Sequence, residues 1–196
     1  MRKTMSILLV ILLAALPVFT AGGENTEAPE TTYSAVEWKT FRKNSESIVE
    51  KGSFVSLTEI GMKLWVPDEC VRQDYGDPAV FAFSNGQTED ILGFSVFTEE
   101  LPEDVPAGDP EALFNYISTG VADPDSAARS LINGIFCITY TIGLEKQAGI
   151  AFPAEDGNII NFVIEAMTEE ESEHNAMIRL MEASIMPLGM NPDAAE

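Results

Sequence analysis

From residue 54 onward the chain consists mainly of short segments in which apolar and polar residues alternate. Alternation with a period of two places every second side chain on one face, so it predicts half-buried β-strands. The predicted strands cover residues 54–57, 61–67, 79–83, 91–98, 135–142, 149–153 and 158–166. Three of the intervening segments contain the turn pairs Asn85-Gly86, Asn133-Gly134 and Asp156-Gly157. Such pairs favour tight hairpin turns, which predicts an antiparallel sheet.

Three other segments carry apolar residues at helical spacing, namely residues 34–52, 109–121 and 168–186. The first and the third begin with a capping box, in which Ser34 is followed by Glu37 and Thr168 by Glu171. A short strand over residues 36–40 is the alternative for the start of the first helix. Each helix has one apolar stripe and is expected to pack on the sheet.

The second helix has the clearest start, because Asp109 is a capping carboxylate and Pro110 occupies the first turn. Gly120 lies near its expected end. Residues 123–129 behind it are predicted to be a polar connector. Helices and hairpin strands in this order predict the α+β class, with a curved antiparallel β-sheet packed against helices.

The N-terminal segment has the order of a secretory signal peptide. Arg2 and Lys3 precede an apolar run over residues 7–16, and small residues follow Pro17. The run is about half the length that a bilayer-spanning helix needs. We therefore expect residues 1–21 to be a cleaved signal peptide and the protein to be secreted, extracellular or in the cell envelope. Residues 22–32 are predicted as a flexible spacer, 33–190 as one domain and 191–196 as a tail.

The charge of the chain is strongly acidic, with 11 Lys and Arg against 32 Asp and Glu and a net charge of −21. Loss of the signal peptide makes it more acidic still, because Arg2 and Lys3 leave with it. Such a charge repels phosphate backbones, so we expect no nucleic-acid partner. We also expect no membrane insertion after cleavage of the signal.

Metal sites of the common kinds are not recognisable in the sequence. One histidine and two scattered cysteines do not give zinc spacing, and no cofactor motif is present. Calcium takes oxygen ligands, so acidic loops are the remaining candidates. The first group is Glu99, Glu100, Glu103 and Asp104, and a second pair is Asp123 and Asp125. Neither group has the spacing of an EF-hand.

Nucleophilic chemistry has few candidates. His174 is the single histidine and is predicted to lie on an exposed helix face, among acidic residues. Cys70 and Cys137 allow one disulfide in an oxidising compartment, with a buried free thiol at Cys137 as the alternative. Trp38 and Trp65 are predicted as core residues. Tyr75 lies in a turn-rich stretch and is the aromatic residue expected to be exposed for binding.

Several of these segments together resemble the PsbP-like sandwich. The resemblance rests on Gly61-Met-Lys-Leu-Trp-Val-Pro67, a hairpin, the helix at Asp109, Ile132-Asn-Gly-Ile135 with Tyr140, and the closing Ala183-Ser-Ile185. This fold occurs in the extrinsic PsbP proteins of photosystems, in the Ran-binding Mog protein and in uncharacterised exported bacterial proteins, which the chain resembles most. The resemblance implies a curved antiparallel sheet between helices and no catalytic residue.

PsbP and Mog act through protein partners, so the resemblance implies a binding role. We therefore expect an exported non-enzymatic domain that binds a protein partner or a surface ligand, without a cofactor. A carboxylate-dependent extracellular hydrolase is one alternative, since two acids in a cleft suffice for glycoside hydrolysis. A calcium-dependent structural or adhesive module is the other.

Overall fold

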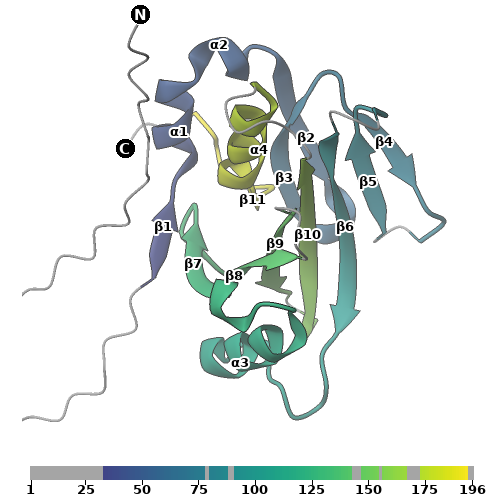
Figure 1. Cartoon of the computed structure of the whole chain (residues 1–196), viewed down its shortest axis with the longest axis vertical. Coiled ribbons are helices and arrows are strands. Elements are labelled where there is room, and N and C mark those ends of the chain that lie inside the picture. Colours follow the sequence, from purple (N-terminus) through teal and green to yellow (C-terminus); the bar gives the residue numbers. More distant parts are fainter. Residues whose placement is uncertain are drawn as a thin grey trace, which may run out of the picture. The chain divides into compact units, whose positions relative to one another are not determined.

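The computed structural model describes residues 33–77, 80–87, 91–142, 147–154, 156–166 and 173–193. The predicted signal peptide and spacer, and the capping box at Thr168, lie outside these residues. Within them the chain forms helices and two β-sheets (Figure 1). The predicted α+β class is confirmed, whereas the prediction of one antiparallel sheet is wrong.

Eight strands form the larger sheet, in the order β1-β7-β8-β9-β10-β6-β5-β4. They are β1 (Ser34–Val36), β4 (Val71–Asp74), β5 (Phe81–Ser84), β6 (Leu92–Glu100), β7 (Ala128–Ile132), β8 (Ile135–Ile142), β9 (Gln147–Pro153) and β10 (Asn158–Ala166). β1 pairs in parallel with β7, while the other neighbours pair antiparallel. The large sheet is therefore mixed.

The smaller sheet has the order β11-β3-β2. It consists of β2 (Gly52–Leu57), β3 (Met62–Pro67) and β11 (Met186–Pro187), with a 3-10 turn, η1 (Thr58–Ile60), between β2 and β3. Leu64, Trp65 and Val66 are all buried, so both faces of β3 are covered. The predicted alternation of buried and exposed residues over 61–67 is therefore wrong. Trp65 is confirmed as a core residue.

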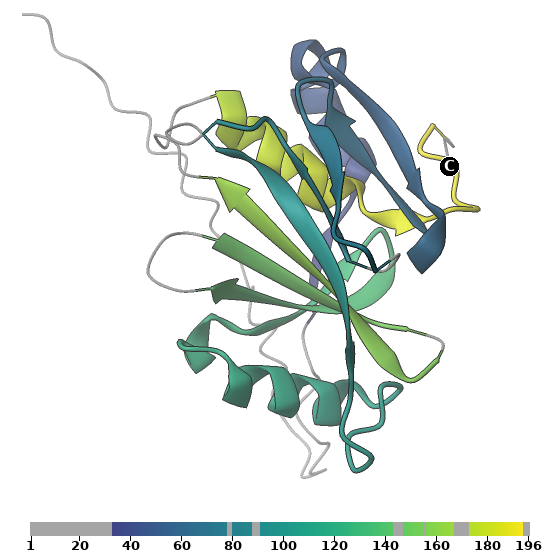
Figure 2. The same cartoon turned by 90° about the vertical axis from the view of Figure 1, so that its right-hand side faces the viewer.

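Helices α3 (Pro110–Gly120) and α4 (Glu173–Ser184) cover opposite faces of the large sheet (Figure 2). Cys137 and Ile138 show this division, because the first belongs to the core under α4 and the second to the core under α3. Asp109 caps α3 as predicted, since its carboxylate accepts hydrogen bonds from the N–H groups of Glu111 (2.9 Å) and Ala112 (3.2 Å). The sheet thus has two separately filled cores.

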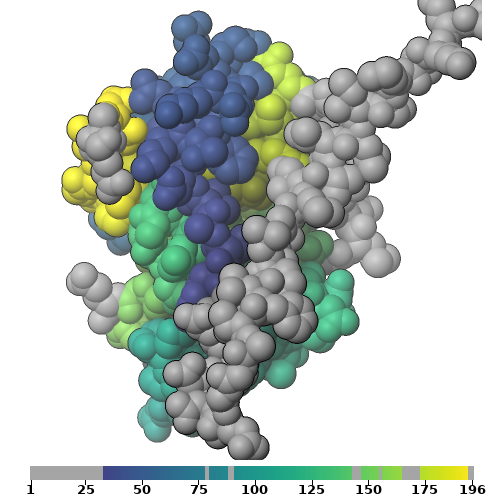
Figure 3. All heavy atoms as spheres, turned by 90° about the vertical axis from the view of Figure 1, so that its left-hand side faces the viewer, coloured from purple at the N-terminus to yellow at the C-terminus, as the bar shows by residue number. Residues whose placement is uncertain are grey.

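The predicted first helix is corrected at its start. Ser34 does not cap a helix but lies in strand β1, opposite Ser130 of β7. Helix α1 (Trp38–Asn44) begins four residues later and is followed by the short α2 (Glu46–Val49). Figure 3 shows both helices in blue on the surface beside α4. Trp38 itself is buried, as predicted.

The predicted polar connector is also corrected. It contains a 3-10 turn, η2 (Pro124–Ser126), and its last two residues, Ala128 and Arg129, begin strand β7. Ser130 is only 3% exposed and its hydroxyl lies 3.1 Å from that of Thr139 on β8. Strand β7 pairs with β1 on one side and with β8 on the other. These neighbours satisfy its backbone hydrogen bonds, so the segment forms a strand although its sequence did not indicate one. Ile132 of β7 pairs with Ile135 of β8 across a two-residue turn. The turn residues Asn133 and Gly134 have φ of 50° and 79°.

Candidate functional site

A cavity of about 430 Å³ opens at the C-terminal end of α3, on the α3 face of the large sheet. Its volume is within the range of small-molecule sites. We call it the Glu99 pocket. It is lined by Glu99, Tyr116, Ile117, Thr119, Gly120, Val121, Ala122, Tyr140, Thr141, Ile142 and Asn161.

Four side chains in the Glu99 pocket form one hydrogen-bonded chain. The Tyr116 hydroxyl donates to Oε1 of Glu99 at 2.6 Å. The Asn161 amide donates to Oε2 of Glu99 at 3.3 Å and accepts from the Tyr140 hydroxyl at 3.2 Å. Both hydroxyl protons and one N–H of the amide are therefore directed toward the carboxylate, either directly or through the amide.

The strand order explains how these side chains meet. Glu99 lies on β6 and Asn161 on the adjacent β10, whereas Tyr140 lies on β8, beyond β9. The residue of β9 opposite Tyr140 is Gly149. A Cβ atom there would lie 2.3 Å from the phenol ring, so a glycine is needed for the ring to lie across β9 and reach Asn161.

The two phenols keep their protons at neutral pH. The hydrogen bond to Glu99 is the main factor that raises the pKa of Tyr116, and burial adds to it. Burial is the main factor for Tyr140, and the negative charge of Glu99 raises its pKa further. Both hydroxyls thus remain donors to the Glu99 network.

Sequence reasoning named Glu99 only as a calcium candidate, and it missed the other three members. The detectable sign was Asn161, a polar amide within the otherwise apolar run 159–164. Asn161 is 1% exposed. A buried amide of this kind requires polar partners, so it points to a network that the strand pattern alone does not reveal.

The four calcium candidates are not brought together as ligands. Glu99 points into the Glu99 pocket, while the next residue along β6, Glu100, is exposed on the other side of the strand. Within the described ranges no group of three or more His, Cys, Asp and Glu side chains could hold a metal ion. Asp123 directly precedes the 3-10 turn η2 and Asp125 lies within it.

Tyr75 is confirmed as an exposed aromatic residue. Its side chain is 61% exposed, and its hydroxyl donates to Oε1 of Gln73 at 3.3 Å. It follows the last residue of β4, the edge strand of the large sheet, and does not line the Glu99 pocket. Its predicted binding role stays a prediction.

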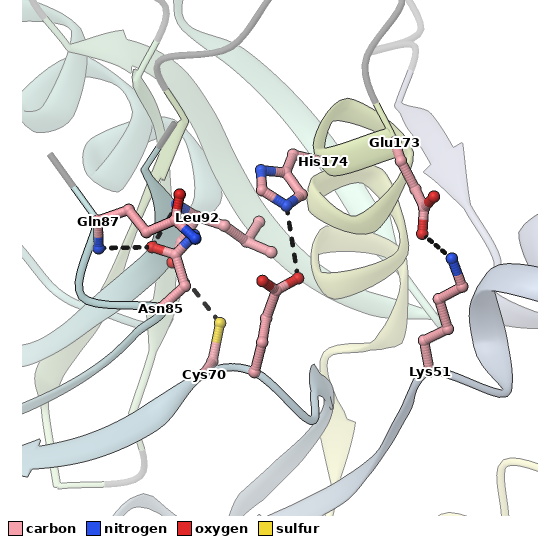
Figure 4. Close-up of polar contacts among 8 residues, drawn as sticks. Lys51, Cys70, Asn85, Gln87, Leu92, Glu173 and His174 are labelled. Atoms are coloured by element: carbon pink, nitrogen blue, oxygen red, sulfur yellow. Dashed lines mark hydrogen bonds and ion pairs between the residues drawn. The ribbon is translucent and has the colours of Figure 1, made fainter. Parts of the chain in front are cut away.

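His174 is not exposed as predicted, because only 15% of its side chain is accessible. It lies in the first turn of α4, with Nε2 at 3.4 Å from Oε1 of Glu69. The neighbouring Glu173 pairs with Lys51 (Figure 4).

The thiol of Cys70 turns toward Leu92 and not toward His174 (Figure 4). It contacts the carbonyl oxygen of Leu92 at 3.6 Å. The structure therefore shows no cysteine–histidine pair at this place.

Cys70 and Cys137 are both buried free thiols, so the structure does not contain the disulfide. Cys137 donates to the carbonyl of Ser130 on β7 at 3.7 Å, and Cys70 to that of Leu92 on β6. Three strands of the sheet separate β6 from β7. A disulfide needs Cα atoms within about 7 Å, which this placement does not offer.

We predict that neither thiol reacts with iodoacetamide in the native protein. Burial raises the pKa of both Cys70 and Cys137 to about 12. Their thiolate population is then on the order of a thousandfold below that of a free cysteine. Mass spectrometry should find no adduct on the folded protein near neutral pH and two adducts in guanidinium chloride. Rapid native labelling of Cys70 would contradict this assignment.

No helix in the described part of the chain has both the length and the apolar character to span a membrane.

The geometry of the Glu99 pocket is the main basis for an interpretation of function. Compared with protein-family models and with curated proteins, the sequence matches none.

Proposed function

We propose that the protein is an exported, non-enzymatic domain that binds a small ligand, or a side chain of a protein partner, in the Glu99 pocket. The single observation that carries the proposal is the hydrogen-bonded chain from Tyr140 through Asn161 and Glu99 to Tyr116. It fixes a carboxylate at the wall of an open cavity of ligand size. A carboxylate held in place by two hydrogen bonds, from Tyr116 and Asn161, loses little freedom when a ligand binds.

A binding role accounts for the site better than hydrolysis does. A carboxylate mechanism needs two acids, one of which holds its proton, and among the described residues that line the pocket Glu99 is the one acid. A second cavity is lined by Glu59 and Asp156. Glu59 cannot be the proton donor there, because a backbone hydrogen bond and the ion pair with Arg72 at 2.9 Å lower its pKa.

The proposal also includes the PsbP-like sandwich and export from the cell. Support for the sandwich comes from α3 and α4, which cover opposite faces of the strands (Figure 2). Relative to the expected arrangement, the parallel strand β1 and the separate three-stranded sheet are additions. Export rests on the predicted signal peptide.

We predict that Gly120→Phe blocks ligand binding. Gly120 lines the Glu99 pocket and is exposed, and a Cβ atom there would meet no atom within 4 Å, so a larger side chain can begin at this position without a clash. Gly108→Phe is the matched control, since it too has open space but does not line the pocket. A fragment screen by two-dimensional NMR on the ¹⁵N-labelled protein should shift amides around residues 119–122. Gly120→Phe should weaken these hits at least about tenfold and Gly108→Phe should not.

Two results would contradict the proposal. One is a screen whose hits leave residues 119–122 and 140–142 unshifted in the wild-type protein. The other is turnover of a glycan or peptide library that disappears in Glu99→Gln, which would favour the hydrolase.

A further inference from the structure

We infer that the Glu99 pocket selects ligands that carry a protonated alkylamine. This inference rests on the proposed binding function and adds the chemical class of the ligand. It follows from the directions of the hydrogen bonds, the end of α3 and the apolar walls of the pocket.

The first observation is that the pocket offers hydrogen-bond acceptors. A carboxylate has about four lone-pair positions, and Tyr116 and Asn161 use two of those on Glu99. The hydroxyl protons of Tyr116 and Tyr140 are already donated within the chain, which leaves lone pairs on their oxygens. Glu99 and the two phenol oxygens therefore favour an incoming group that brings its own N–H or O–H donors.

The Thr119 hydroxyl is likewise a hydrogen-bond acceptor toward a ligand, because its proton is already used. It donates to the carbonyl oxygens of Asn115 and Tyr116, both at 2.9 Å. Among the described residues that line the pocket, none is Lys, Arg or His. An anionic ligand would thus meet a carboxylate without a compensating cation.

The second observation is the position of the pocket at the C-terminal end of α3. The last turn of this helix and the next two residues, up to Ala122, line the cavity. The C-terminus of a helix carries a partial negative charge. Basic residues often compensate it, but the last turn of α3 has none. Helix and carboxylate therefore favour a cation at the same place.

The third observation distinguishes an organic cation from a metal ion. Calcium requires six to eight oxygen ligands, whereas Glu99 is the single carboxylate among the described residues that line the pocket. The walls include the side chains of Ile117, Val121 and Ile142, which suit an alkyl chain. An ammonium group with three N–H donors on an alkyl stem satisfies all these features. Its source is either a free amine or a lysine side chain of a partner.

The test is a calorimetric titration of the protein with n-butylammonium chloride, butan-1-ol and sodium butyrate. We expect butylammonium to bind at least about tenfold more tightly than the alcohol or the carboxylate, because the alcohol has no positive charge to pair with Glu99 and butyrate is repelled by it. Equal affinity for the ammonium and the alcohol would overturn the inference. This comparison uses the wild-type protein, so it does not depend on the stability of a variant.

Glu99→Gln removes the charge and should weaken butylammonium binding at least about tenfold. Glu100→Gln is the matched control, because it makes the same change one residue along β6 on an exposed side chain, and it should stay within about twofold. An unchanged affinity in Glu99→Gln would also overturn the inference. Nα-acetyl-lysine N-methylamide, compared with its norleucine analogue, then separates the sources. Tighter binding than butylammonium indicates a partner's lysine, and weaker binding a free amine.

These outcomes separate the inference from the proposed function. If neutral or anionic fragments bind in the Glu99 pocket and butylammonium does not, the binding function stands and the ammonium class is wrong. If Gly120→Phe leaves all binding unchanged, the proposed site itself is wrong.

Discussion

Replacing Asn133 with alanine is expected to lower the free energy of unfolding by about 3 to 5 kcal/mol, a large part of the stability of a typical domain. The Asn133 side chain accepts a hydrogen bond from the backbone N–H of Trp38 at 2.9 Å. It also donates to the carbonyl oxygens of Ala183 (2.8 Å) and Ile185 (2.9 Å). One amide thus connects the start of α1, the β7–β8 turn and the end of α4.

The substitution has two separable costs. Alanine leaves three backbone groups without their partner, and each half-buried group costs about 1 kcal/mol or more. It must also adopt the positive φ of 50° seen at Asn133, which costs an ordinary residue roughly 1 kcal/mol. Asn133→Gly loses the same three hydrogen bonds, but glycine adopts a positive φ without strain. The difference in unfolding free energy between the two variants therefore isolates the backbone strain.

Urea denaturation near neutral pH provides the measurement. Asn115→Ala is the control, because Asn115 is exposed on α3, and its effect should stay within about 0.5 kcal/mol. If Asn133→Gly unfolds at the same urea concentration as the wild-type protein, the three hydrogen bonds do not stabilise the fold and the interpretation is wrong.

Glu182→Gln is expected to stabilise the protein by about 2 kcal/mol near pH 8 and to have little effect near pH 4. Burial on α4 raises the pKa of Glu182 from 4.5 to about 7, although Arg179 lowers it in part. The folded protein then binds this proton more tightly than the unfolded chain. Its contribution to stability is complete below about pH 4.5 and is lost as the pH rises through 7.

The difference between variant and wild type matters here, because the other carboxylates titrate in both proteins. Any loss of negative charge relieves repulsion in so acidic a chain, and the exposed Glu46→Gln on α2 measures that contribution. Thermal unfolding of the three proteins across this pH range is the experiment. A stabilisation by Glu182→Gln that is independent of pH, or equal to that of Glu46→Gln, would show that Glu182 is ionised as usual.

The sequence by itself determined the features whose causes lie within a few residues. The strands over residues 135–142 and 158–166, the turn at Asn133-Gly134 and the cap at Asp109 all appear in the structure as predicted. A period of two, a positive φ and an N-terminal carboxylate each depend on the local backbone, so the residue type is enough to indicate them.

The tertiary structure alone decided the division into two sheets, the start of α1 and the site. The backbone N–H of Trp38 donates its hydrogen bond to Asn133, 95 residues away, so no pattern near Ser34 could locate the helix start. Glu99 and Asn161 are 62 residues apart and meet only because β6 pairs with β10. Local preferences place a side chain on a face, but which strands become neighbours depends on the packing of the whole core. That pairing placed Glu99, expected in an acidic loop, within strand β6 and in the wall of a pocket.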